Sequence, residues 1–194
     1  MTGRWAAFLD RDGTLVDGEG FITKPEDLRL LPGAAPAVKR LREAGALVIV
    51  ITNQPAVARG LIDEPGLRRI HDRLDVLFAE AGAPLDAIYY CPHHPETHHP
   101  EANDPRYRKL CECRKPNIGM LTRAARDFGV NLARSFMVGD STRDVQTAKN
   151  AGCRGVLVKT GAGGNDGRFA ARPDAVCPDV LAAAEWIVEQ ARAK

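Results

Sequence analysis

The stretch WAAFLDRDGTL, residues 5–15, decides the fold class and the chemistry of this chain. Its first five residues form an apolar run that stops at Asp10, which is the pattern of a short buried strand in a parallel sheet. Asp10 and Asp12 then lie on the loop after this strand, where Gly13 lets the backbone turn tightly. One carboxylate could attack a substrate while the other moves protons. Taken alone, however, Asp-x-Asp-Gly is more often an ordinary turn.

Four further apolar runs resemble the first, and each ends on a polar or metal-binding residue. We expect strands at 5–9, 46–51, 86–91, 136–138 and 155–159, with helical spacing of apolar residues between them. This alternation predicts a single α/β domain over residues 1–194, built on a doubly wound, Rossmann-like parallel sheet flanked by helices. Ligands are then expected at the carboxyl edge of the sheet. The segment after the first strand is too short for a large cap domain.

Two loops interrupt the alternation of strands and helices. Residues 92–115 carry potential metal ligands, and residues 161–167 are rich in glycine, a composition typical of a flexible loop. The first loop is therefore a candidate metal site, and the second has no assigned role.

Composition excludes several classes of function. The chain is 44% hydrophobic and 27% charged, with a net charge of +2, and it has no basic run interleaved with aromatic residues. It also has no apolar run long enough to span a membrane and no secretory signal at its start. We therefore expect a cytoplasmic monomer with reduced thiols, and neither a nucleic acid nor a membrane as partner.

Cysteine and histidine residues gather in the region of the first loop. Cys91 and His93 precede the loop's centre, and Cys111 and Cys113 follow it. Three sulfurs and one imidazole form a donor set that holds structural zinc in a closed tetrahedral site. From the residues alone, buried free thiols remain the alternative.

The motifs that follow the predicted strands are similar, in the same order, to those of the haloacid dehalogenase superfamily. They are Asp10 to Thr14, Thr52, Lys115, and the acidic segment Gly139 to Asp144. The resemblance implies a phosphatase in which Asp10 is the nucleophile that forms an aspartyl-phosphate, and Asp12 is the general acid and base. It also implies that the transferring phosphoryl group is stabilised by Thr52, Arg114 and Lys115.

The resemblance further implies a magnesium ion as cofactor. Its ligands would be the carboxylates of Asp10 and Asp140 and the backbone carbonyl of Asp12, with Asp144 supporting the ion without binding it directly. Magnesium prefers hard oxygen ligands of this kind.

Beyond the superfamily motifs, the chain resembles the branch that contains the heptose 1,7-bisphosphate phosphatases and the histidinol-phosphate phosphatases. The segments that carry this resemblance are Thr52 to Gln54, Ile88 to Pro95, and Cys111 to Pro116. It implies a structural zinc on the four Cys and His residues named above, which would hold Arg114 and Lys115 in place, with His94 as a neighbour of the zinc site. The residues implied in substrate contacts are Gly18, Glu19, Gly20, Phe21, Asn53, Gln54, Pro55, Arg59 and Ser141.

The resemblance favours a small phosphorylated sugar as substrate, namely the 7-phosphate of D-glycero-D-manno-heptose 1,7-bisphosphate, in the synthesis of nucleotide-activated heptose for lipopolysaccharide or capsule. Histidinol phosphate and other small sugar phosphates are the alternatives within the same chemistry. A zinc-loop binding protein without catalysis is the alternative from another class. Outside these motifs, we expect His71 to be partly exposed and Cys153 and Cys177 to be small core residues.

Overall fold

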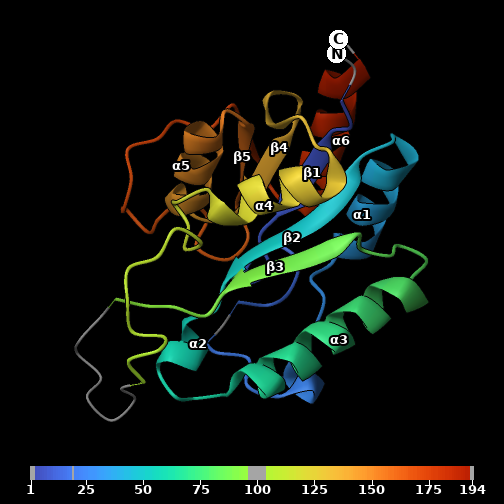
Figure 1. Ribbon diagram of the computed structural model, residues 1–194. Coiled ribbons are helices and arrows are strands. Elements are labelled where there is room, and N and C mark those ends of the chain that lie inside the picture. The colour runs from blue at the N-terminus through green and yellow to red at the C-terminus, as the bar shows by residue number, and fades with distance from the viewer. Residues whose placement is uncertain (1–2, 19, 96–103, 193–194) are drawn as a thin grey trace.

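A parallel sheet forms the centre of the computed structural model, which describes residues 3–18, 20–95 and 104–192 (Figure 1). In the described residues the sheet has six strands in the order β3-β2-β1-β4-β5-β6, and every neighbouring pair is parallel. The predicted doubly wound α/β fold is confirmed. The strands are β1 (Ala6–Leu9), β2 (Leu47–Asn53), β3 (Ala87–Cys91), β4 (Phe136–Gly139), β5 (Arg154–Val158) and β6 (Ala175–Cys177).

Helices cover both faces of the sheet. The α-helices are α1 (Ala34–Glu43), α2 (Pro55–Ala58), α3 (Glu64–Glu80), α4 (Gly119–Phe128), α5 (Thr142–Ala151) and α6 (Val180–Arg192), and the 3₁₀ turns are η1 (Pro25–Asp27) and η2 (Leu132–Arg134). No helix of the described segments is long and apolar enough to cross a membrane.

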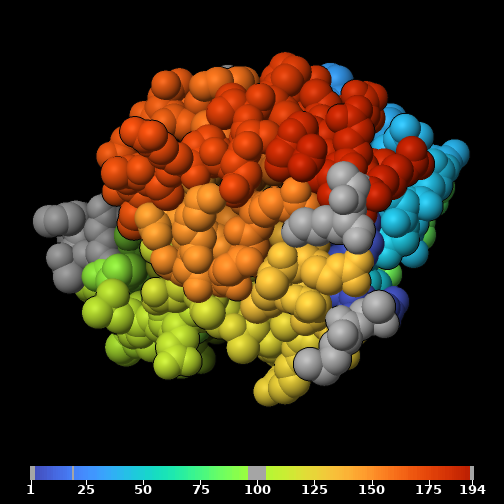
Figure 2. Space-filling model, turned by 90° about the horizontal axis from the view of Figure 1, so that it is seen from above, coloured from blue at the N-terminus to red at the C-terminus, as the bar shows by residue number. Residues whose placement is uncertain are grey.

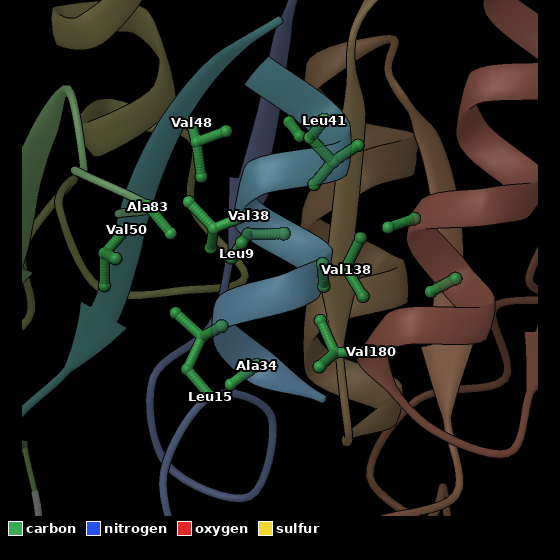
Figure 3. Close-up of a cluster of buried hydrophobic side chains, with 14 of the residues drawn as sticks. Leu9, Leu15, Ala34, Val38, Leu41, Val48, Val50, Ala83, Val138 and Val180 are labelled. Carbon is green, nitrogen blue, oxygen red and sulfur yellow. The ribbon is translucent and has the colours of Figure 1, made fainter. Parts of the chain in front are cut away.

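Alternation of side chains along the strands divides the core into two layers. The first layer packs α1, α3 and α6 against one face of the sheet, and Figure 3 shows part of it, with Val38 and Leu41 of α1 drawn beside Leu9, Val48 and Val138. The second layer packs α4 and α5 against the other face, where Phe8 and Met137 point. Because both faces are covered, β1 and β4 are apolar along their whole length, and β2 is apolar until Thr52.

The ends of the helices follow the signals in the sequence. The Asp63 carboxylate accepts a hydrogen bond from the Gly66 N–H at the start of α3, and Gly129 and Gly152 end α4 and α5 in the left-handed conformation. Because all the strands are parallel, the loops that follow β1, β2, β4 and β5 lie at one edge of the sheet.

The C-terminal elements β6 and α6 were not among the sequence predictions. The strand β6 is only three residues long and exposes Val176 at the edge of the sheet, so it leaves no clear alternation. The helix α6 packs along α1, and Figures 1 and 2 both show the red C-terminal residues beside the light-blue α1. Its buried residues Val180, Ala183, Ala184, Ile187 and Val188 have helical spacing, so the signal for α6 is present in the sequence.

Candidate active site

Three carboxylates and one lysine converge at the carboxyl edge of the sheet. Asp10 follows β1, and Asp140 and Asp144 lie after β4 and in the first turn of α5. The Lys115 Nζ lies 2.9 Å from Asp10 Oδ1 and 2.6 Å from Asp144 Oδ1. One oxygen from each carboxylate lies within 4.8 Å of the others. The structure therefore brings together residues that are far apart in the sequence, as predicted.

Negative charge exceeds positive charge in this cluster. Burial raises the pKa of Asp10 to about 7; Lys115 opposes this shift, whereas Asp144 and Asp140 add to it. Burial likewise raises the pKa of Asp140 to about 6, although the Ala162 N–H favours the charged form. Three acidic groups around one buried cation leave room for a second positive charge, and their oxygen donors are those that magnesium prefers. The donor set therefore fits the predicted magnesium ion.

Two local features fix the lysine and Asp144. Ser141 caps α5, where its N–H and its hydroxyl both donate to Asp144 Oδ2, so this carboxylate is held with one oxygen left for Lys115. The Asn53 side chain bonds both the N–H and the carbonyl of Lys115, which ties the lysine's backbone to the end of β2.

A buried polar network holds the second aspartate of the motif. The Arg11 side chain is 1% exposed and donates to both Asp12 oxygens, and its guanidinium also donates to Gln54 Oε1. The Gln54 amide then donates to Asp12 Oδ2 and to Thr52 Oγ1. Arg11 and Gln54 thereby fix the direction in which the Asp12 carboxylate points.

The expectation that His71 is partly exposed was wrong. His71 is buried on α3, and its Nε2 lies 3.3 Å from Arg11 Nη1. A guanidinium only donates, so this ring nitrogen must accept and the ring must be neutral. Burial, followed by the charge of Arg11, lowers the pKa of His71 to about 3. The helical spacing of apolar residues predicted that His71 lies on a helix, but it did not predict the contact between His71 and the Arg11 side chain.

The predicted zinc ligands lie together. Cys113 Sγ is 3.2 Å from the Sγ atoms of Cys91 and Cys111 and 3.3 Å from His93 Nδ1, and Cys91 Sγ is 3.5 Å from Cys111 Sγ. Hydrogen bonding from Cys91 lowers the pKa of Cys113 to about 5, which favours a thiolate. Donor separations of this size are close to the edges of a tetrahedral zinc site, roughly 3.8 Å, so the four side chains could hold a zinc ion.

The glycine-rich loop after β5 forms part of the site. The Ala162 N–H donates to Asp140 Oδ2 at 2.7 Å, the Gly164 N–H donates to the Asp140 carbonyl, and the Thr160 hydroxyl donates to the Gly13 carbonyl. Sequence reasoning assigned no role to this loop. Its position after a strand, at the edge where the other site residues lie, was the signal that could have identified it.

Comparisons with known proteins agree with this arrangement. A family model for HAD-hydrolase-like proteins matches residues 112–183. The D-glycero-D-manno-heptose-1,7-bisphosphate 7-phosphatase of Thermosynechococcus vestitus is 44% identical over 190 residues, which cover 95% of each chain. The corresponding enzyme of Escherichia coli K12 is 35% identical over 94% of this chain and 87% of the relative. The chain belongs to the heptose-bisphosphate phosphatase family of HAD hydrolases.

A solved structure shows the same relationship in three dimensions. The D,D-heptose 1,7-bisphosphate phosphatase of B. bronchiseptica, complexed with magnesium and phosphate, superposes with a TM-score of 0.80 at 38% identity, covering 96% of this chain and 99% of the other. That member of the heptose-bisphosphate phosphatase family binds both species that the carboxylates and Lys115 would receive here.

A cavity of about 510 Å³ lies over the cluster of this HAD phosphatase. Its lining includes many of the predicted residues and adds others that sequence reasoning missed. The predicted residues in the lining are Asp10, Asp12, Gly18, Asn53, Lys115, Asp140 and Ser141, and the additional ones are Gly13, Asp17, Leu31, Arg143, Gly161, Ala162, Asp166 and Arg168.

Other predicted residues of the HAD phosphatase lie outside this lining. Thr52 and Gln54 are buried behind Asp12, and Arg114 lines an adjoining cavity. The Arg59 guanidinium lies over the Phe21 ring, 5.1 Å from its centre. Gly20 and Pro55 are described but do not line the cavity, and Glu19 lies outside the described residues.

Proposed function

We propose that this chain is a magnesium-dependent phosphomonoester hydrolase that removes the 7-phosphate of D-glycero-D-manno-heptose 1,7-bisphosphate through an aspartyl-phosphate on Asp10. The observation that carries the proposal is the convergence of Asp10, Asp140 and Asp144 on Lys115 under one open cavity. The names of the relatives supply the sugar.

The reaction divides between the two aspartates of the first motif. Asp10 attacks the phosphorus, and the bond from phosphorus to the sugar oxygen breaks while the protonated Asp12 gives its proton to that oxygen. Water then attacks the phosphorus of the aspartyl-phosphate and gives a proton to Asp12. Inorganic phosphate leaves, and the Asp10 carboxylate is restored. Arg11 and Gln54 keep Asp12 in place for both proton transfers.

Positive charge must balance the phosphate and the aspartate that approaches it. Lys115 supplies one charge at the phosphoryl oxygens, with Thr52 and Arg114 as further proposed donors. The carboxylates of Asp10 and Asp140, with the Asp12 backbone carbonyl, would hold magnesium, which when bound supplies further positive charge at the phosphoryl group. Asp144 pairs with Lys115 and Ser141, in keeping with a supporting role.

The cluster of Cys91, His93, Cys111 and Cys113 is proposed to hold a structural zinc ion. All four positions of a tetrahedral site would be filled by protein, so no position would remain for water or substrate. Lys115 follows Cys113 by two residues, so the zinc would fix the segment that carries the lysine.

The proposed function is tested by replacing the nucleophile. We expect Asp10→Asn to lower phosphate release about 1,000-fold or more without loss of the folded state, because an amide cannot form the aspartyl-phosphate. Asp72→Asn, on the exposed side of α3, is the matched control and should keep full activity. Phosphate release is measured with the heptose bisphosphate, histidinol phosphate and hexose bisphosphates. Full activity of Asp10→Asn would refute the mechanism, and preference for histidinol phosphate would refute the proposed sugar.

A further inference from the structure

Three arginine side chains gather next to the cluster of carboxylates. Arg143 lies in the first turn of α5, Arg168 lies on the loop after β5, and both line the cavity over Asp10 and Lys115. They also line an adjoining cavity of about 290 Å³, together with Arg114 of the zinc loop. Figure 1 shows the orange loop after β5 beside α5, on the side where the yellow-green zinc loop lies. The two cavities therefore share a rim of guanidinium groups.

The arginines of this rim have few direct partners in the protein. The Arg114 Nη1 donates to the His93 carbonyl at 3.0 Å. In the part of the chain that the structure describes, no carboxylate forms an ion pair with Arg143 or Arg168. Asp166 lies nearby, but its oxygens accept from the N–H and the hydroxyl of Thr142 at the start of α5.

The placement of Arg143 does not favour folding. The N-terminal end of a helix carries partial positive charge, so a cation in the first turn costs stability rather than adding to it. Arg114 and Arg168 come from two other segments and add like charge to the lining of the same cavity. Such an arrangement is stable when an anion binds between the arginines.

We propose that Arg143 and Arg168, next to Arg114, bind the second phosphate group of the substrate and so select sugar bisphosphates over sugar monophosphates. This inference rests on the proposed function, since the first phosphate is the one that Asp10 and Lys115 receive. A phosphate monoester carries about −1.5 to −2 charges at pH 7, and a guanidinium donates to its oxygens in pairs.

The test compares two substrates that differ only in the second phosphate. Phosphate release is measured with D-glycero-D-manno-heptose 1,7-bisphosphate and with the matching heptose 7-phosphate, and the ratio of the two kcat/KM values is the readout. We expect Arg143→Gln and Arg168→Gln each to lower this ratio about tenfold, mainly through a higher KM for the bisphosphate. Arg168→Lys keeps the charge and should recover part of the ratio.

A matched control removes the same charge elsewhere. Arg172 lies on the same C-terminal segment, is exposed and lines neither cavity. The substitution Arg172→Gln should therefore leave the ratio of the two kcat/KM values unchanged. Because Arg168 is exposed and Arg143 is only half-buried, the wild-type ratio should also fall as salt is raised from 50 to 500 mM, about twofold or more, by screening.

Binding without turnover provides a second readout. In the Asp10→Asn background, titration calorimetry with the bisphosphate and the 7-phosphate should show tighter binding of the bisphosphate, and adding Arg143→Gln and Arg168→Gln together should remove the difference. Equal ratios in wild type and in both glutamine variants, or an effect of Arg172→Gln as large as theirs, would overturn the inference while leaving the phosphatase intact. A different result would refute the proposed function itself: the wild type would release phosphate from neither substrate.

Discussion

Lys115 is a buried cation whose partners are two carboxylates, so its removal leaves charge without compensation. We expect Lys115→Met to lower the free energy of unfolding by about 3 kcal/mol in the presence of a chelator, because Asp10 and Asp144 then repel each other in a buried site. Added magnesium should recover part of this loss. Urea unfolding with chelator and with magnesium measures both effects.

The control for this prediction is a lysine with a similar ion pair at the surface. Lys149 lies 2.8 Å from Asp174 but is 41% exposed, so Lys149→Met should cost less than about 1 kcal/mol and should not respond to magnesium. Equal losses for the two variants would show that burial of the Lys115 pair does not matter.

Burial of His71 should make the free energy of unfolding depend on pH. Its pKa falls from 6.5 to about 3 on folding, so below pH 6.5 the unfolded chain binds a proton that the folded chain does not. Stability is therefore lost as the pH falls from 6.5 towards 3, by about 2 kcal/mol at pH 5. His71→Gln, which can still accept from Arg11, should lose less stability between pH 7 and pH 5. Identical pH profiles from urea unfolding would contradict this.

Residues of the active site differ in how far the sequence could predict them. Asp10 and Asp140 belong to motifs directly after strands, and parallel strands end at one edge, whereas Lys115 was implied by the resemblance to the haloacid dehalogenase superfamily. Arg11 and His71 were not predicted, because their contact joins a loop to the underside of α3. A local pattern shows which face of a helix is apolar, but not which distant side chain lies beneath it.

At the scale of elements, the glycine-rich loop packs against the Asp-x-Asp-Gly turn with no room for a side chain. A Cβ on Gly161 would lie 2.2 Å from Asp140 Oδ2 and 2.7 Å from the Gly13 Cα. We expect Gly161→Ala to displace the Asp140 carboxylate, to raise the magnesium concentration needed for half-maximal activity about tenfold, and to lower kcat at saturating magnesium. Magnesium titrations of phosphate release measure this.

Gly152 offers a control with a similar backbone but without the contact. Both glycines have positive φ, 56° at Gly161 and 72° at Gly152, and a Cβ on Gly152 would meet no atom within 4 Å. Gly152→Ala should therefore cost about 1 kcal/mol of stability and leave the magnesium requirement unchanged. If both variants respond alike to magnesium, backbone strain explains the effect and contact with Asp140 does not.

Predictability at the scale of elements follows the strength of the local pattern. The strands from β1 to β5 were predicted within a residue or two, because each is a largely apolar run that ends on a polar or metal-binding residue. The helix α6 has the spacing of a buried helix and could have been predicted as well. The strand β6 could not, since its three residues gain their position from pairing with β5.

For the molecule as a whole, the sequence predicted the layers and the edge of the sheet that carries the site. It did not predict that three loops pack against one another at that edge. Three loops meet there from distant parts of the chain: the turn after β1, the zinc loop and the loop after β5. Their packing depends on side chains such as Thr160 and Asn53, whose partners lie far away in the sequence. Such contacts leave no periodic signal.

The proposed zinc site connects the stability of the whole molecule to its activity, because its ligands Cys111 and Cys113 directly precede Arg114 and Lys115. We expect Cys113→Ser to lose the zinc ion, to lower Tm by about 5 °C or more, and to lower kcat at least about tenfold, because the segment that holds Lys115 is no longer fixed by the metal. Cys153→Ser is the control, since Cys153 is a buried thiol outside the cluster. It should retain one zinc ion per chain and most of its kcat, even where the buried hydroxyl costs stability. Zinc content by atomic emission, thermal unfolding and phosphate release are measured on both. If Cys113→Ser lost its zinc and yet kept both Tm and kcat, the metal would not hold the lysine in place.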